Sequence, residues 1–318
     1  MKRAMICGVS GQDGALLANL LISKGYQVWG TSRDAQVANF GNLKTLGISS
    51  SVNLLSMAQT DFKSVLNSLS RSDPDEVYFL SGQSSVGLSF EQPAETIESI
   101  SLGVLNLLEA IRFIGKPVRI YNASSSECFG DVGKQRATEE MPFHPRSPYG
   151  VAKASAHWLV TNYREAYGLF ACNGILFNHE SPLRPERFVT RKIVSSACRV
   201  SLGSNEKLHL GRLDVVRDWG WAPEYVEAMW KMLQIDIPGD YVIATGYSVK
   251  LQDFVARAFE YVDLDWKEHV DSDELLFRPS DIVHSSADPT KASKILGWSA
   301  TTIMPQLVDR LMEAELKK

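Results

Sequence analysis

Short apolar runs alternate with longer segments of helical periodicity through the first half of the chain. The apolar runs predict strands at 4–7, 26–30, 52–57, 76–80, 118–121 and 172–177. The helical spacing of apolar residues predicts helices at 15–24, 95–113 and 148–167. Nearly continuous apolar strands that are separated by helices are typical of a parallel sheet covered on both faces. We therefore predict an α/β protein built on a Rossmann-type, doubly wound parallel sheet.

The pattern changes beyond Ser181, where the elements become shorter and proline interrupts them repeatedly. We expect residues 181–318 to form mainly a smaller mixed α/β C-terminal lobe, with some later segments returning to the first domain, residues 1–180. Such a lobe would close over the carboxyl ends of the strands, where open α/β sheets bind their ligands.

Composition and charge exclude several classes of function. The formal net charge of -4 gives no electrostatic footprint for nucleic acid or an anionic membrane. The four cysteines form no CxxC pair and the six histidines have no metal-binding spacing, so we expect reduced thiols and no metal. The first apolar run is too short for a secretory signal and no stretch has the ~20 apolar residues of a membrane span. We expect a cytoplasmic protein.

A glycine-rich turn follows the first predicted strand and precedes the first predicted helix. Its glycines, Gly8, Gly11 and Gly14, are spaced GxxGxxG, with Gln12 and Asp13 between the last two. Glycine permits a tight turn and close approach of the backbone to a pyrophosphate, and the helix N-terminus offers free N–H groups. This context predicts a dinucleotide-binding domain in residues 1–180 and a substrate-binding role for the later lobe.

The second predicted strand ends in a segment that bears on the choice of dinucleotide. Arg33 and Asp34 lie ~20 residues beyond the glycine turn, where an arginine would bind a 2′-phosphate and an acid would bind a ribose 2′-hydroxyl. Because Arg33 comes first, we favour NADP over NAD.

The predicted helix at 148–167 carries a Tyr-Lys pair. Tyr149 and Lys153 are four residues apart and therefore lie on one helical face. An ammonium beside the phenol should lower the tyrosine pKa, so that the phenolate can take a hydroxyl proton while hydride leaves to a nicotinamide. The pair predicts an oxidoreductase step.

A run of serines and one acid follow the fifth predicted strand, at the sheet edge where this architecture places its chemistry. Ser125 could donate a hydrogen bond to the reacting oxygen, and Glu127 would be a second acid/base group. Hydride transfer alone does not need the extra carboxylate, whereas elimination of water does. We therefore predict an enzyme that oxidises a hydroxyl and also eliminates water.

The chain resembles the GDP-mannose 4,6-dehydratase family of the extended short-chain dehydrogenase/reductase superfamily over nearly its whole length. GILFNHESPLR and RDWG are far more specific than the superfamily motifs. The segments that carry the resemblance are GQDG (11–14), SFEQP (89–93), SSE (125–127), RSPYGVAK (146–153), NYREAYG (162–168), GILFNHESPLR (174–184), FVTRK (188–192), RDWG (217–220), YVIATG (241–246), FRP (277–279) and DPTKA (288–292).

The resemblance implies a three-stage reaction on GDP-mannose. Tyr149, assisted by Ser125 and Lys153, removes the C4 hydroxyl proton while NADP accepts hydride. Glu127 then removes the C5 proton as water leaves from C6. The same cofactor returns the hydride to C6, which gives GDP-4-keto-6-deoxy-D-mannose.

The resemblance also implies the binding residues and the assembly. We expect a homodimer or homotetramer, with helices near 95–113 and 148–167 packing between subunits. The implied cofactor-binding residues are Gly8, Gly11, Gln12, Asp13, Gly14, Arg33, Leu80, Gln83, Ser84, Tyr149, Lys153, His179 and Arg184. The implied substrate-binding residues are Ser84, Ser126, Glu127, Asn178, Val189, Lys192, Arg217, Arg278 and Asp281.

Departures from the family pattern leave alternatives open. Pro185, Arg212 and Asp281 stand where the family usually has glycine, asparagine and glutamate, so a related GDP-sugar such as a GDP-manno-heptose is an alternative substrate. A 4-keto-sugar reductase or epimerase on the same scaffold is a second alternative. A non-catalytic dinucleotide-sensing subunit is a third, which the intact Tyr149 and Glu127 disfavour.

Overall fold

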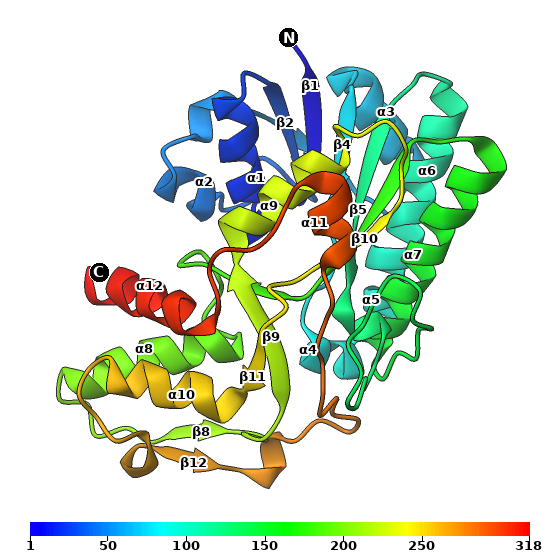
Figure 1. The fold of residues 1–318 in the computed structure, drawn as a ribbon. Coiled ribbons are helices and arrows are strands. Elements are labelled where there is room, and N and C mark those ends of the chain that lie inside the picture. Colours follow the sequence, from blue (N-terminus) through cyan, green and yellow to red (C-terminus); the bar gives the residue numbers. More distant parts are fainter.

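The computed structural model describes all 318 residues, and its core is a seven-stranded sheet in which every strand pairing is parallel (Figure 1). The strand order β10-β6-β5-β4-β1-β2-β3 contains the doubly wound order of a Rossmann fold, so the predicted fold class is confirmed. The strands are β1 (Arg3–Cys7), β2 (Gln27–Ser32), β3 (Val52–Ser56), β4 (Glu76–Phe79), β5 (Arg119–Ser125), β6 (Ala171–Leu176) and β10 (Asp240–Ile243).

The central strands are buried along their whole length, which explains their continuous apolar character. β5 runs to Ser125, four residues beyond the predicted end of the apolar run at Tyr121. Its polar residues are buried because they have partners: the Asn122 side-chain amide donates to Asn173 Oδ1 of β6 at 2.8 Å. The polar end of β5 is thus carried into the interior, where the site lies.

Two layers of helices cover the sheet. The predicted helix at 148–167 is confirmed as α7, where the Ser147 hydroxyl accepts from Gly150 N at 3.0 Å and Pro148 opens the first turn. The helix predicted at 95–113 is formed by α5, a π-helical turn (Glu98–Leu102) and α6 in succession. One face carries α1 (Gln12–Ser23), α2 (Gly41–Thr45), α9 (Ala222–Met232) and α11 (Thr290–Leu296), and the other α3 (Phe62–Ser72), α5 (Pro93–Ile97), α6 (Gly103–Ile114) and α7 (Pro148–Tyr167).

The smaller mixed α/β lobe packs below the carboxyl ends of the sheet strands (Figure 1). It contains a three-stranded sheet, a parallel strand pair and three helices around their own apolar core. α9, β10 and α11, although late in the chain, join the first domain. The lobe elements are β7 (Asn178–Glu180), β8 (Leu208–Leu210), β9 (Val216–Trp221), β11 (Ser248–Lys250), β12 (Val270–Ser272), α8 (Val189–Ser201), α10 (Leu251–Glu260) and α12 (Met304–Leu316), and α4 (Val86–Glu91) lies beside the sheet edge.

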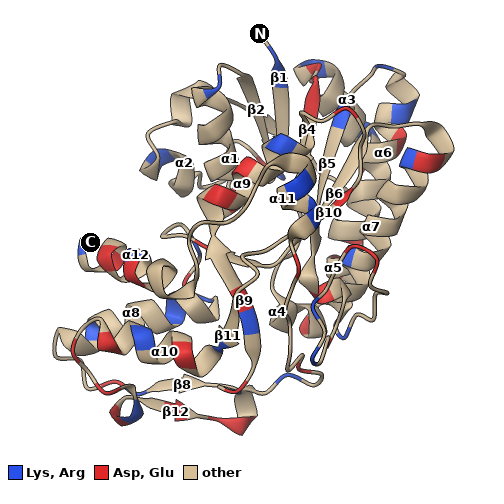
Figure 2. Ribbon diagram, in the orientation of Figure 1, with Lys and Arg blue, Asp and Glu red and all other residues tan.

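Basic and acidic residues are intermixed over both lobes in the view of Figure 2. This agrees with the small net charge of -4. None of the helices combines the length and the apolar character that crossing a bilayer requires.

The glycine turn can be tested through a pair of alanine substitutions. A Cβ at Gly14 would lie 2.3 Å from Gly8 O and 2.7 Å from Val9 Cα, whereas a Cβ at Gly11 meets only Gly8 O, at 3.5 Å. We expect Gly14→Ala to lower the free energy of unfolding in urea by at least about 3 kcal/mol, because the clash is with rigid backbone. Gly11→Ala should change it by less than about 1 kcal/mol. Equal unfolding midpoints for the two variants would contradict this packing.

Candidate active site

A cavity of about 440 Å³ lies between the carboxyl edge of the sheet and the smaller lobe. Its walls come from the end of β5, the first turns of α7, β7, β9 and the segment before residue 282. Sixteen of the predicted site residues line it: Asp13, Leu80, Ser84, Ser125, Ser126, Glu127, Tyr149, Lys153, Asn178, His179, Arg184, Val189, Lys192, Arg217, Arg278 and Asp281.

The other predicted site residues lie outside the cavity wall. They are Gly8, Gly11, Gln12, Gly14, Arg33 and Gln83. Gln12 ties the glycine turn to the lobe, because its amide donates to His179 O at 3.2 Å and accepts from the Ser181 hydroxyl at 2.8 Å. The Arg33 side chain is 87% exposed at the end of β2, with Glu95 at 3.7 Å.

Tyr149 and Lys153 lie on one face of α7 beside the end of β5, with Lys153 Nζ 5.8 Å from the Tyr149 ring centroid. Lys153 Nζ donates to Ala123 O at 2.7 Å. Burial raises the pKa of Tyr149, and a hydrogen bond with Ser125 opposes this only in part. Burial also lowers the pKa of Lys153 to about 8. The predicted lowering of the tyrosine pKa is therefore wrong, since burial of the phenol outweighs the hydrogen bond with Ser125.

A short turn after β5 presents Glu127 to the cavity. The turn is fixed by its own residues, because Ser125 Oγ accepts from Glu127 N at 3.3 Å. Burial raises the pKa of Glu127, while the charges of Arg217 and Arg278 oppose the rise. A carboxyl group with a raised pKa can exchange protons nearer neutral pH, which suits an acid/base group.

Asp13 and His179 form an ion pair at the floor of the cavity. Their side chains approach to 2.9 Å, and the imidazole stacks on Tyr225 with 4.6 Å between ring centroids. Burial opposes ionisation of Asp13, but the His179 charge and hydrogen bond outweigh it and lower the pKa of Asp13 to about 2. The pKa of His179 is raised, because Asp13 more than offsets the effect of burial. The pair joins the start of α1 to β7.

This pair predicts a bell-shaped dependence of stability on pH. A depressed Asp13 pKa stabilises the fold above about pH 4, an effect lost as pH falls toward 2. A raised His179 pKa stabilises the fold below about pH 6.5, an effect lost as pH rises through the folded-state value. We expect Asp13→Asn to cost about 2 kcal/mol of unfolding free energy between these limits and less outside them. Urea unfolding at several pH values measures this, with the exposed Asp236→Asn as control; a cost independent of pH would contradict the pairing.

Basic side chains gather at the lobe end of the cavity. Arg217 donates to Ile282 O at 2.7 Å and to Val216 O at 2.8 Å, so it also holds the segment that carries Arg278. Arg184 lies 3.3 Å from Glu180 and over the Phe188 ring. Arginine pairs with two phosphate oxygens at once, which makes this end suitable for a diphosphate.

Sequence reasoning missed three further basic residues of the wall, Arg187, His209 and Arg212. Arg187 lies between two recognised segments, 174–184 and 188–192, and its position there could have found it. Arg212 was noted only as a departure, and it forms an ion pair with Asp214 at 2.6 Å. No local signal marks His209, since it reaches the cavity through the pairing of β8 with β12.

The family model described as GDP-mannose 4,6 dehydratase matches residues 5–311. The chain belongs to the GDP-mannose 4,6-dehydratase family. Among its curated relatives, GDP-mannose 4,6 dehydratase 1 of Arabidopsis thaliana is 44% identical over 326 residues, which cover 99% of this chain and 90% of the relative. The family expected from the sequence motifs is thereby confirmed.

Solved structures of related enzymes share the whole fold of this GDP-mannose 4,6-dehydratase family member. UDP-glucose 4-epimerase of Thermus thermophilus, in complex with NAD, is 25% identical with a TM-score of 0.84, covering 97% of this chain and 98% of its own. RMD from Pseudomonas aeruginosa, complexed with NADPH, is 21% identical with a TM-score of 0.81, covering 99% of each chain. At 21% identity, the likeness to RMD supports the fold alone.

Proposed function

We propose that this chain is a hydro-lyase that dehydrates GDP-D-mannose to GDP-4-keto-6-deoxy-D-mannose with NADP as its cofactor. The observation that carries the proposal is the presence of Tyr149, Lys153 and Glu127 in the wall of one cavity whose far end is basic. The relatives that share the family are named for the same activity.

The residues present fit a nicotinamide dinucleotide. Gly8 takes a φ of 85°, and Gly14 packs directly on the backbone of Gly8 and Val9, so the tight turn before α1 would leave the N–H groups at the helix N-terminus to hold a pyrophosphate. Residues 1–180, together with α9, β10 and α11, form the dinucleotide-binding domain in this proposal. The exposed Arg33 at the end of β2 is available for a 2′-phosphate, which favours NADP. When bound, the nicotinamide accepts a hydride and later returns it.

The chain's own residues act first at the C4 hydroxyl. Ser125 and Tyr149 contact the hydroxyl oxygen, and Tyr149 takes its proton. Burial raises the pKa of the phenol, and the hydrogen bond with Ser125 and the positive charge of Lys153 favour its ionisation as the proton is taken. Lys153, held by Ala123 O, keeps a positive charge beside the phenol.

Glu127 acts in the second stage. A ketone at C4 makes the C5 hydrogen acidic, and Glu127 takes this proton as the C6 hydroxyl leaves as water. Its raised pKa, caused by burial, lets the same group hold the proton and pass it to the leaving hydroxyl.

The basic end of the cavity holds the nucleotide part. Lys192, Arg217 and Arg278 bind the diphosphate. The other proposed substrate contacts in the cavity wall are Ser84, Ser126, Asn178, Val189 and Asp281. The other proposed cofactor contacts are Leu80, Ser84, His179 and Arg184 in the wall and Gln83 outside it.

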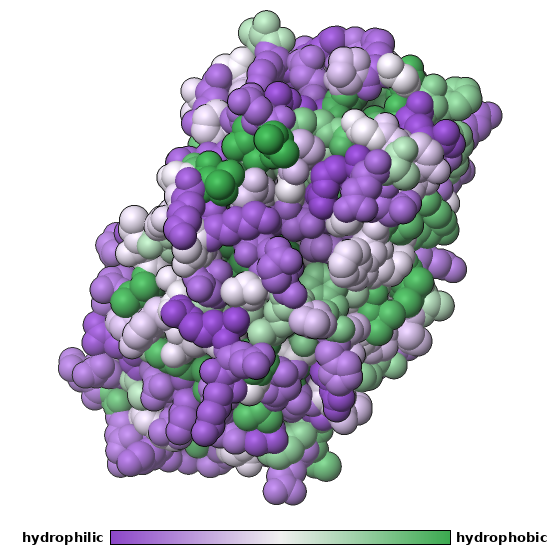
Figure 3. Space-filling model, turned by 45° about the vertical axis from the view of Figure 1, so that its right-hand side comes forward, coloured by the Kyte–Doolittle hydropathy of each residue, from purple (hydrophilic) through white to green (hydrophobic).

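We also propose that the functional unit is a homodimer or homotetramer in which α6 and α7 pack between subunits. α6 and α7 carry four exposed large apolar side chains that contact with another subunit would cover: Phe113 (74% exposed), Trp158 (58%), Tyr167 (52%) and Val151 (45%). Figure 3 turns this side of the molecule forward and shows hydrophobic patches among hydrophilic residues along its right-hand side.

Incubation of the purified protein with GDP-mannose and catalytic NADP tests the proposed function. The expected product is 18 mass units lighter than the substrate, since one water is lost, and added NADPH is not consumed. If GDP-mannose stays unchanged while GDP-manno-heptose is dehydrated, GDP-manno-heptose is the substrate instead. Steady consumption of NADPH with a 4-keto sugar would contradict a dehydratase and favour a reductase.

A further inference from the structure

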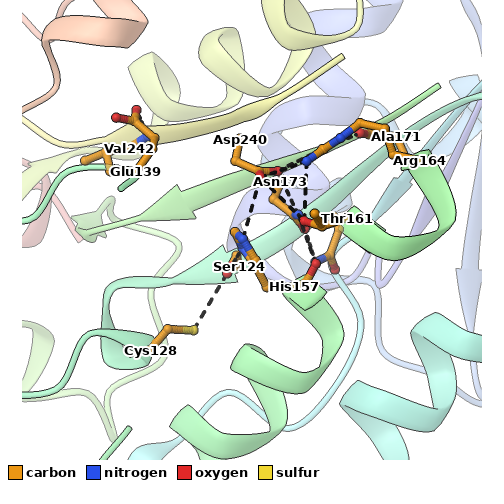
Figure 4. Close-up of polar contacts among 11 residues, drawn as sticks. Ser124, Cys128, Glu139, His157, Thr161, Arg164, Ala171, Asn173, Asp240 and Val242 are labelled. Atoms are coloured by element: carbon orange, nitrogen blue, oxygen red, sulfur yellow. Dashed lines mark hydrogen bonds and ion pairs between the residues drawn. The ribbon is translucent and has the colours of Figure 1, made fainter. Parts of the chain in front are cut away.

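A line of buried polar side chains runs behind the end of β5 (Figure 4). His157 lies one turn after Lys153 in α7, is 4% exposed and has Nδ1 3.3 Å from Ser124 Oγ. Ser124 Oγ in turn lies 3.7 Å from Cys128 Sγ. Because Lys153 holds Ala123 O, two successive turns of α7 are attached to two successive residues of β5. Both attachments lie immediately before the proposed catalytic turn.

The other side of the imidazole faces Asp240 at the start of β10, with His157 Nε2 3.7 Å from Asp240 Oδ2. Asp240 is itself fixed by other groups. Arg164 donates to its two oxygens at 2.8 and 2.9 Å, and the Asn173 amide donates at 2.9 Å. The aspartate therefore presents a constant negative charge to one edge of the ring.

These surroundings decide the state of His157. Burial lowers the pKa of His157 to about 4, an effect that Arg164 reinforces and Asp240 opposes, so the ring is neutral near pH 7. The negative charge of Asp240 favours the tautomer with its N–H on Nε2, in which Nδ1 accepts a hydrogen bond from the Ser124 hydroxyl. Phe143 packs edge-on against the ring, with 4.8 Å between centroids, and limits its rotation.

Serine, histidine and aspartate in a line also occur in hydrolases, but the arrangement here does not suit a nucleophile. Ser124 lines the cavity but is only 3% exposed, and its hydroxyl lies between His157 Nδ1 and Cys128 Sγ. Asp240 lies beyond hydrogen-bonding distance of the ring and is committed to Arg164 and Asn173. The arrangement suits a fixed support.

We propose that His157 is a positioning residue, which through Ser124 holds the turn Ser125–Glu127 in register with Tyr149 and Lys153. Its role would be to keep the β5 end from shifting along α7 while Ser125 and Glu127 act on the substrate. The expected effect on kcat rests on the proposed function. The expected protonation state and tautomer of His157 do not.

Substitutions at His157 and Ser124 test separately the Nδ1 side of the ring, which faces Ser124, and the Nε2 side, which faces Asp240. Asparagine at 157 places an amide oxygen near the Nδ1 position and can still accept from Ser124, glutamine reaches only the Nε2 position, and phenylalanine keeps the packing alone. We expect His157→Phe, His157→Gln and Ser124→Ala each to lower kcat about tenfold to a hundredfold with KM within about threefold. His157→Asn should recover kcat to within about fivefold of wild type. The exposed His144→Asn is the control.

A double variant distinguishes positioning from general damage. If His157 acts through Ser124, the kcat of the Ser124→Ala, His157→Phe double variant equals the lower of the two single-variant kcat values. Losses that multiply, or a His157→Phe variant with wild-type kcat, would overturn the proposal. If the phenylalanine variants do not fold, equal kcat values for the asparagine and glutamine variants would overturn it instead.

A measurement on the unmodified protein is independent of the reaction. Nitrogen-15 NMR of the histidine rings is expected to show His157 neutral, with the proton on Nε2, from pH 8 down to about pH 5. A protonated ring at pH 7, or a proton on Nδ1, would overturn the proposal. Failure of the wild-type protein to dehydrate GDP-mannose would overturn the proposed function. The NMR measurement would still decide the protonation state and tautomer of His157.

Discussion

Replacing Tyr149 with phenylalanine is expected to lower turnover of GDP-mannose by about a thousandfold or more, because the phenol is the group that takes the C4 hydroxyl proton in the proposed mechanism. The phenol lies beside Lys153 at the carboxyl edge of the sheet, and burial raises its pKa. The substitution removes only one oxygen, so folding should stay near wild type and dinucleotide affinity should fall far less than turnover. Steady-state turnover and dinucleotide titration measure the two effects separately.

Tyr261→Phe is the matched control for this variant. Tyr261 follows α10 in the smaller lobe, is 36% exposed and does not line the cavity. Its substitution should leave turnover within about twofold of wild type. Turnover by Tyr149→Phe within tenfold of wild type would show that another group takes the proton.

Replacing Glu127 with glutamine is expected to separate oxidation from elimination. Glutamine has the same shape but cannot accept the C5 proton, so loss of water should slow by about a hundredfold to ten-thousandfold. Oxidation at C4 does not need the carboxylate, since Tyr149 serves there. We therefore expect GDP-mannose to reduce the bound cofactor and leave it reduced, which absorbance at 340 nm would follow while mass spectrometry follows the loss of 18 mass units.

The exposed Glu140→Gln variant controls for the change of charge, and it should behave as wild type. Loss of water at the wild-type rate by Glu127→Gln would contradict the role of the carboxylate. A variant that neither reduces the cofactor nor loses water would place Glu127 in the first stage instead.

The sheet could be predicted because burial of both faces makes each central strand a continuous apolar run. β10 was not predicted, although it joins the sheet beside β6. It has four residues, and its place depends on distant contacts: Val242 N donates to Glu139 at 2.7 Å, across 103 positions of the chain. Helical spacing predicted that Tyr149 and Lys153 share a face, since that rule is local.

The electrostatic state of the site could not be predicted from spacing. The depth at which Tyr149 is buried, and the engagement of Lys153 by Ala123 O, depend on how α7 packs on β5. The same packing creates the contact of His157 with Ser124. The sequence does show that His157 shares a helical face with Lys153, since it follows Lys153 by four residues. It does not show which strand residue this histidine contacts, so no role could be predicted for it.

Intramolecular hydride transfer is the central claim, namely that oxidation at C4, loss of water and reduction at C6 occur in one cavity during one turnover. GDP-mannose carrying deuterium at C4 tests it most directly. We predict that each product molecule carries that deuterium at C6 and that none enters added unlabelled NADP. Product without deuterium at C6, or deuterium collecting in the pool of free cofactor, would contradict the account.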